Sequence, residues 1–290
     1  MKTRSLEKTG WALLGFHALV SLFGLAGIGI MLPNPDLWSG IDMLARAFPL
    51  ALAQGGNVQI WSGAAAVLVF GAVIAGRRAV LIFFTVSVLL SIGLELLGTV
   101  YGWPFGNYEY TDLFGYKLFG RVPPAIPLSW FSMAFSSFAL AAAIIRKWRG
   151  TAGLWSSIAL GSIMLTTWDL VLDPAMSNDA LALQYWVWED VGPYMGIPLI
   201  NFLGWVAAGS AMMFAASYFD DRLRPIDAGA SPFFLAMYLC NLVFAIGICA
   251  SSQLWLPAMV GSGLAAAVLI GWLLPRDPVA LRLVARREEA

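Results

Sequence analysis

The sequence has little charge, one histidine and four lysines, and each scarcity excludes a class of protein. Only 12% of the 290 residues are charged and the formal net charge is zero, which disfavours a soluble domain and gives no reason to expect a nucleic-acid partner. One histidine, His17, is too few for a di-iron oxygenase or for paired-histidine haem ligation. None of the lysines lies within an apolar run, so a retinal Schiff base is not indicated.

Cysteine and nucleotide-binding motifs are equally sparse. Cys240 and Cys249 lie nine residues apart in one apolar run, so on a helix they would face opposite sides about 13 Å apart, too far for a disulfide. No G-x-G-x-x-G follows a strand-like segment, so no flavin or nicotinamide site is visible. These absences leave acid–base chemistry, metal-assisted chemistry or no chemistry, and we expect neither a cofactor nor a metal site.

Apolar residues dominate what is present. The chain is 60% hydrophobic with a mean hydropathy of +0.77, and a membrane-spanning helix needs about 20 mostly apolar residues. We therefore predict an all-α polytopic membrane helix bundle that forms a single transmembrane domain over 1–290. Because Asp42, Arg46 and Pro49 interrupt the run 37–54, we expect an interfacial or re-entrant segment there. Eight segments remain as predicted spans, at 11–32, 58–75, 79–100, 127–146, 152–173, 197–219, 232–250 and 255–274.

The distribution of Lys and Arg predicts the orientation of these spans. With eight spans and a cytoplasmic N-terminus, 14 of the 17 basic residues fall in cytoplasmic segments, and the bias of Lys and Arg sets topology. The sequence therefore predicts that the N- and C-termini are both cytoplasmic. Only Arg46, Lys117 and Arg121 fall in outer segments.

Three carboxylates lie inside predicted spans, namely Glu95, Asp169 and Asp173. A carboxylate at the bilayer centre costs about 3 kcal/mol on insertion scales, which makes a functional role the default hypothesis. Asp173 precedes Pro174, and a residue before proline resists the α conformation. We therefore expect Asp173 to mark the end of its helix, either as a cap or as part of a site, with Asp169 one turn earlier on the same face.

These acids and one amide are predicted to lie at a common depth, toward the outer surface. Glu95 and Asp169 approach the outer ends of their helices, and Asn201 lies four residues into another helix at that end. We expect these three side chains to line one cavity. Many aromatic residues in the two adjacent loops favour the same site, although an interfacial aromatic belt would explain some of them. They include Tyr101, Trp103, Phe105, Tyr108, Tyr110, Tyr185, Trp186, Trp188 and Tyr194.

A short internal repeat supports a shared site. Ile126-Pro127-Leu128 opens one helix and Ile197-Pro198-Leu199 opens another. Each follows a helix with a buried acid and then an aromatic loop. Two helical hairpins, 79–146 and 152–219, are therefore expected to contribute matching parts.

Several segments, in order, resemble the CruF-type carotenoid hydratases, which include carotenoid 1′,2′-hydratases and bisanhydrobacterioruberin hydratases. The resemblance covers a motif-bearing core of about residues 80–220. It is carried by Glu95 with Gly102-Trp-Pro-Phe-Gly-Asn-Tyr-Glu-Tyr110, Val122-Pro-Pro-Ala-Ile-Pro-Leu-Ser-Trp130, Trp168-Asp-Leu-Val-Leu-Asp-Pro174 and Gly196-Ile-Pro-Leu-Ile-Asn-Phe-Leu-Gly-Trp205.

The resemblance implies addition of water across the terminal carbon–carbon double bond of an acyclic ψ end group. It implies a carotenoid, water and membrane lipid as partners, in a bacterial or archaeal cell membrane. Protonation of an alkene needs a carboxylic acid, and burial favours the protonated form of a carboxyl group. Aromatic faces stabilise the resulting cation.

From the residues themselves we infer the individual roles. Asp169, sharing a proton with Asp173, is expected to act as the general acid, and Glu95 is expected to position or deprotonate the attacking water. The residues expected to line the cation and substrate are Tyr108, Tyr110, Trp168, Trp186, Trp188 and Asn201.

Three other interpretations remain open. The D-x-x-x-D spacing of Asp169 and Asp173 also occurs in intramembrane prenyltransferases, where such acids hold magnesium diphosphate. A membrane lycopene cyclase would use the same first protonation and then close a ring. A carotenoid or lipid transporter without catalysis is expected instead to have paired broken helices at mid-membrane.

Overall fold

The computed structural model describes residues 2–145, 150–223 and 232–274. Within these ranges eight helices are long and apolar enough to cross a membrane, which confirms the predicted all-α polytopic bundle of eight spans. Large apolar side chains cover their outward faces, as shown by Phe23, Leu89 and Leu203, which are 77%, 65% and 66% exposed. Lipid is the solvent that such faces require, so the chain is an integral membrane protein. The helices are α1 (Lys2–Ala26), α2 (Asp42–Ile74), α3 (Arg77–Tyr101), α4 (Ala125–Ile145), α5 (Gly150–Ser177), α6 (Leu199–Phe219), α7 (Phe233–Ser251) and α8 (Trp255–Leu273).

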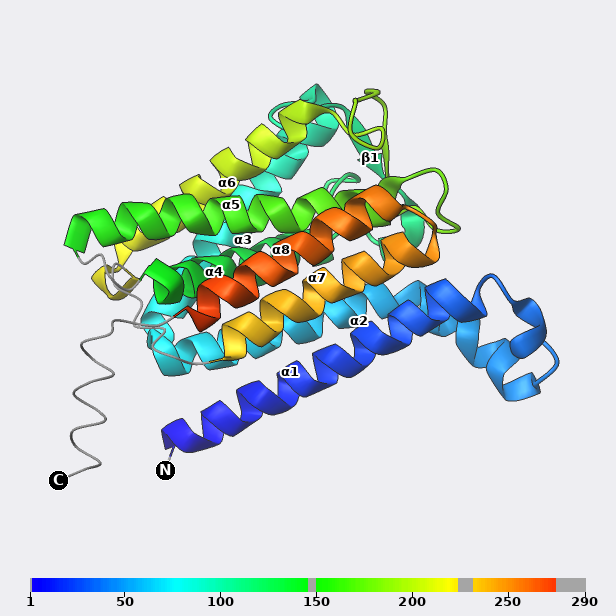
Figure 1. The fold of residues 1–290 in the computed structure, drawn as a ribbon, viewed down its shortest axis with the longest axis horizontal. Helices are drawn as coiled ribbons and strands as arrows, with labels where there is room; N and C mark the ends of the chain where they lie inside the picture. Colours follow the sequence, from blue (N-terminus) through cyan, green and yellow to red (C-terminus); the bar gives the residue numbers. More distant parts are fainter. Residues whose placement is uncertain (1, 146–149, 224–231, 275–290) are drawn as a thin grey trace.

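The eight helices pack as an up-and-down bundle. Helix α1 begins and α8 ends at the same end of the bundle, and the connections after α1, α3, α5 and α7 lie at the opposite end (Figure 1). Helix α4 is apolar on all sides and is packed against α2, α3, α5 and α7, the position expected of a helix without a polar face. Which end faces the cytoplasm stays a prediction from the charges.

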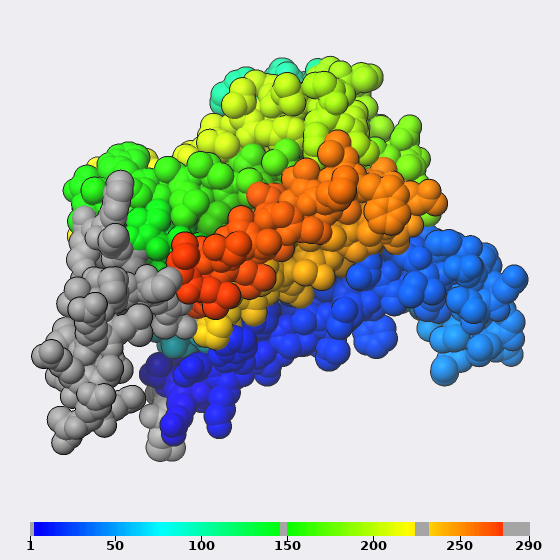
Figure 2. Space-filling model, viewed as in Figure 1, coloured from blue at the N-terminus to red at the C-terminus, as the bar shows by residue number. Residues whose placement is uncertain are grey.

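Helix α2 differs from the prediction at its N-terminus. Residues 42–54 do not form a separate segment; they are the first turns of one continuous helix of 33 residues. At 1.5 Å per residue this helix is about 50 Å long, which exceeds the hydrocarbon core of about 30 Å. Together with the turn after α1 it projects beyond the other helices (Figure 2). The predicted boundary at residue 58 was therefore wrong, because Pro49 does not break the helix. The interfacial position of 42–54 stays a prediction.

Helix α5 also continues further than predicted. Pro174 lies inside the helix, which ends at Ser177, so Asp173 lies one turn before the end and the prediction that it marks the helix end was wrong. A proline has no N–H to donate to the carbonyl four residues earlier. Here the hydroxyl of Tyr194 donates to that carbonyl, Leu170 O, at 2.8 Å. Burial raises the pKa of Tyr194 to about 12, so this hydroxyl keeps its proton at neutral pH.

Replacing Tyr194 by phenylalanine is expected to destabilise the protein without changing the cavity acids. The Leu170 carbonyl would lose its donor, a loss of about 1 kcal/mol, equivalent to a fall of about 2–4 °C in Tm for proteins of comparable size. Thermal unfolding in detergent measures this. Tyr218→Phe, at a 68% exposed position on α6, is the control, and an equal Tm for both variants would contradict this account of how the helix continues.

The two aromatic loops pair to form a short antiparallel ribbon. Strand β1 (Tyr108–Tyr110) follows α3, and β2 (Trp186–Trp188) follows α5. Side chains alternate between the two faces of a strand, so Glu109 and Val187 in the middle of the strands point outward. The flanking aromatic residues point into the bundle. Their pairs across the ribbon are Tyr108 with Trp188 and Tyr110 with Trp186.

Candidate functional site

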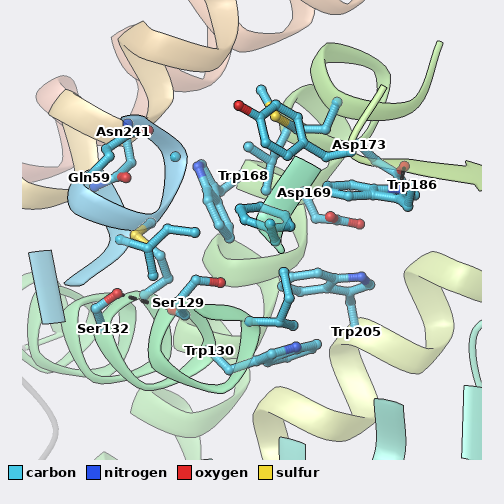
Figure 3. A pocket seen from close by; sticks show the side chains of 18 of the residues that line it. Gln59, Ser129, Trp130, Ser132, Trp168, Asp169, Asp173, Trp186, Trp205 and Asn241 are labelled. Carbon is cyan, nitrogen blue, oxygen red and sulfur yellow. Dashed lines mark hydrogen bonds between the residues drawn. The ribbon is translucent and has the colours of Figure 1, made fainter. Parts of the chain in front are cut away.

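A cavity lies between the helices beneath this ribbon. Its volume is about 110 Å³. All nine residues predicted to be catalytic or to line the substrate line it, so the expected common cavity of Glu95, Asp169 and Asn201 is confirmed. Of the other loop aromatics, Tyr101, Trp103 and Tyr194 do not line it. The three acids are nearly inaccessible, with Glu95, Asp169 and Asp173 only 4%, 1% and 2% exposed. The close-up in Figure 3 shows Asp169 and Asp173 with Trp168, Trp186 and Trp205 around them.

Glu95 is held by three hydrogen-bond donors. The hydroxyls of Tyr108 and Tyr110 donate to Glu95 Oε2 at 2.5 and 2.7 Å, and Trp130 Nε1 donates to Oε1 at 2.8 Å. Burial and the nearby Glu95 hold the pKa of both tyrosines well above the usual value of 10, so these hydroxyls remain donors. Gly98, one turn after Glu95, leaves the space for Tyr108, because a Cβ there would lie 3.0 Å from its ring and hydroxyl.

Asp173 is held by four donors. Trp186 Nε1 and Trp188 Nε1 donate to Asp173 Oδ1 at 2.8 and 2.9 Å, and the Ser177 hydroxyl donates to the same oxygen at 3.0 Å. Asn201 Nδ2 donates to Oδ2 at 2.8 Å. Both ribbon strands thus attach to an acid, β1 to Glu95 and β2 to Asp173.

The two halves of the site repeat with the same spacing. In each, an acid on the first helix of a hairpin is followed at +4 by a hydroxyl that donates to the acid's backbone carbonyl, and at +13 and +15 by aromatic donors to its side chain. The ribbon pairs +13 of one half with +15 of the other, as a local two-fold axis requires. The matching sets are Glu95, Thr99, Tyr108 and Tyr110, and Asp173, Ser177, Trp186 and Trp188.

Asp169 breaks this two-fold arrangement. It lies four residues before Asp173, and the corresponding position before Glu95 is Ser91, a fully buried serine. Asp169 Oδ2 accepts one hydrogen bond, from the Asn201 Nδ2 that also serves Asp173, at 3.0 Å. Its Oδ1 has no hydrogen-bond partner among the residues that the structure describes. Asp169 is therefore the cavity acid with an oxygen free to meet a ligand.

Several lining residues were missed from the sequence. The rings of Trp130 and Trp205 stack with centroids 3.9 Å apart, and Trp168 meets Trp205 edge-on at 6.0 Å. Trp130 occupies the third position after Pro127, as Asn201 does after Pro198. The repeat could therefore have predicted Trp130 as a lining residue. Gln59 in α2 and Asn241 in α7 lie outside the two repeated hairpins, so the repeat gave no signal for them.

The described residues contain no group of three or more His, Cys, Asp or Glu arranged to hold a metal ion. The D-x-x-x-D pair instead shares the amide of Asn201. The site therefore has aromatic walls and three carboxyl groups. Asp169 has one oxygen without a hydrogen-bond partner among the described residues, whereas both oxygens of Glu95 and of Asp173 accept hydrogen bonds.

The sequence of this chain is similar to that of one protein family and of a curated relative. The sequence model of a family described as carotenoid biosynthesis protein matches residues 55–268, which include all nine predicted site residues. A bisanhydrobacterioruberin hydratase of Haloarcula japonica is 30% identical over 196 residues. The alignment covers 65% of this chain and 63% of that relative, so the chain spans less than two thirds of the relative's length. No solved structure matches.

Proposed function

This chain belongs to the carotenoid biosynthesis protein family, and from that premise we propose that it is a hydratase acting on the terminal double bond of a carotenoid with an acyclic end group. The predicted family resemblance is thereby confirmed. The relative is named as a hydratase, which supports hydration as the reaction. Its archaeal source supports a prokaryotic cell membrane as the location.

The free oxygen of Asp169 carries the proposal. A general acid must bring its proton within hydrogen-bond reach of the reacting group, and Asp169 Oδ1 lines the cavity with no partner among the described residues. Asp173 receives four hydrogen bonds and lies one turn away. Two carboxylates this close favour a state in which they share one proton. We assign that proton to Asp169, because Asp173 has the donors that an anion needs.

Glu95 is assigned a role different from that expected from the sequence. Both its oxygens already accept hydrogen bonds from protein donors, so it is held as a fixed negative charge rather than as the base that activates water. A preorganised charge stabilises charge that develops in a transition state, because nothing has to reorient during the reaction. Glu95 would therefore stabilise the carbocation electrostatically.

The aromatic residues would enclose the cation. Trp168, Trp205 and Trp130 present ring faces and edges along one side of the cavity, and aromatic faces attract cations. The predicted lining residues Tyr108, Tyr110, Trp186 and Trp188 have their polar atoms engaged with Glu95 and Asp173, which leaves their rings toward the cavity. None of them presents a free nucleophile that would trap the cation.

The reaction balances without a cofactor. The π electrons of the alkene take the proton from Asp169 at the less substituted carbon, and the positive charge forms at the tertiary carbon. The oxygen of water bonds to that carbon and its proton returns to the Asp169 carboxylate. One water is consumed and the acid is regenerated. The long polyene would extend from the cavity between the helices toward lipid.

Isotope labelling in a lycopene-producing bacterium tests this function. We expect expression of the chain, in medium containing ¹⁸O-labelled water, to give a pigment heavier by one water whose oxygen comes from solvent. A ring-closed isomer of unchanged mass would indicate a cyclase instead. Activity that survives treatment of the membranes with a chelator would exclude the prenyltransferase interpretation.

A further inference from the structure

The cavity has a second polar region, away from the acids. Gln59 on α2 and Asn241 on α7 lie on one side of Trp168, while Asp169 and Asp173 lie on the other (Figure 3). Both amides belong to apolar helices, where a polar side chain is energetically unfavourable unless it is hydrogen-bonded or binds a ligand. The proposed proton transfer gives neither Gln59 nor Asn241 a role.

Both amides are fixed through their nitrogens. Asn241 Nδ2 donates to Met237 O at 2.9 Å and to His17 Nε2 at 3.2 Å. Gln59 Nε2 donates to Ser21 Oγ at 3.0 Å. His17 Nδ1 faces the backbone carbonyl of Gln59 at 2.8 Å and must carry the hydrogen, so His17 is the neutral tautomer that accepts at Nε2.

The two amide oxygens are left over by this arrangement. Asn241 Oδ1 and Gln59 Oε1 accept no hydrogen bond from any residue that the structure describes, and both residues line the cavity. A donor is left over as well, since Trp168, only 3% exposed, has a buried indole N–H without a partner among the described residues. Buried polar groups are normally paired with protein or with ordered water.

We propose that Gln59, Asn241 and Trp168 form a binding site for the attacking water. A water molecule offers what the three groups lack, an acceptor for the indole N–H and two donors for the amide oxygens. The proposal rests on the proposed hydratase function. It provides the water position that Glu95, with both oxygens engaged, does not.

The neutral amides of Gln59 and Asn241 are suited to holding the attacking water. An amide oxygen holds and orients water and is a much weaker base than a carboxylate, so it competes less for a proton of the carbocation. A carboxylate in the same place would compete more strongly for that proton and would raise the share of cation that returns to an alkene. The water would be held on the side of Trp168 away from Asp169 (Figure 3), where it can attack the cation before the Asp169 carboxylate takes a proton back. The proton that the water releases after attack would return to the Asp169 carboxylate through further water in the cavity.

Partition of the cation in D₂O tests the proposal. After Asp169 delivers a deuteron, the cation either captures water or loses a proton from an adjacent methyl group, which returns an alkene carrying one deuterium. We expect Asn241→Leu and Gln59→Met to raise the ratio of deuterated alkene to hydrated product about fivefold or more, the effect of one lost hydrogen bond. This ratio does not depend on how much protein folds.

Asn57→Leu is the matched control, because Asn57 lies on α2 two residues before Gln59, donates to Phe114 O and does not line the cavity. Its ratio should equal that of the unmodified protein. An unchanged ratio in both Asn241→Leu and Gln59→Met, with hydrated product still formed, would overturn the water site but leave the hydratase function standing. No hydrated product from the unmodified chain would instead reject the function itself.

Discussion

Replacing Asp169 by asparagine is expected to lower hydration by about 10²–10⁴-fold, the usual contribution of a general acid. Asparagine has nearly the same shape and can still accept from Asn201, which now donates to Asp169 Oδ2 at 3.0 Å. It has no acidic proton to give to the alkene. The change therefore removes the chemistry and keeps the packing. Conversion is measured as hydrated pigment per unit of protein in membranes.

The control is Asp179→Asn, at an exposed position just beyond the end of α5. It should retain full conversion. Activity of Asp169→Asn within a few fold of the unmodified chain, with similar amounts of protein in the membrane, would remove Asp169 from the mechanism. The same result would make Asp173, whose oxygens accept four hydrogen bonds, the remaining candidate for the general acid.

Replacing Glu95 by glutamine is expected to lower hydration by about 10²-fold, the scale of a preorganised electrostatic group. Glutamine has no negative charge, and its NH₂ would face a donor, because Trp130 and two tyrosines all donate to this side chain. Product formation under single-turnover conditions reports this loss directly.

Tyr108→Phe separates charge from hydrogen bonding at Glu95. It removes one donor but keeps the carboxylate, with Tyr110 and Trp130 still in place. A loss of about tenfold or less is expected. Equal losses in Glu95→Gln and Tyr108→Phe would mean that Glu95 serves to anchor the ribbon and not to stabilise the cation.

Much of the fold was predictable because a membrane imposes a simple rule. Apolar length alone located the eight spans, and the acids within them indicated the site. The repeat of Ile-Pro-Leu pointed to paired hairpins, and the structure extends it to matched acids, hydroxyls and aromatic donors. All nine predicted site residues lie in one cavity.

The errors came from contacts between distant segments. Pro174 suggested a helix end, but Tyr194, twenty residues later, supplies the missing donor to Leu170 O. The pairing of β1 with β2 joins segments that are 76–80 residues apart, and nothing local in either tripeptide predicts it. The role proposed for Gln59 and Asn241 depends on Ser21 and His17, which accept hydrogen bonds from the two amide nitrogens and so leave the amide oxygens toward the cavity.

An experimental structure of the Asp169→Asn variant with its carotenoid bound tests the central claim most directly, because that variant should bind substrate without converting it. We expect the terminal double bond to lie beneath the ribbon, within about 4 Å of the side chain at position 169, the range of direct contact. A carotenoid whose end group lies on the lipid-facing surface or elsewhere in the bundle, away from position 169, would contradict it.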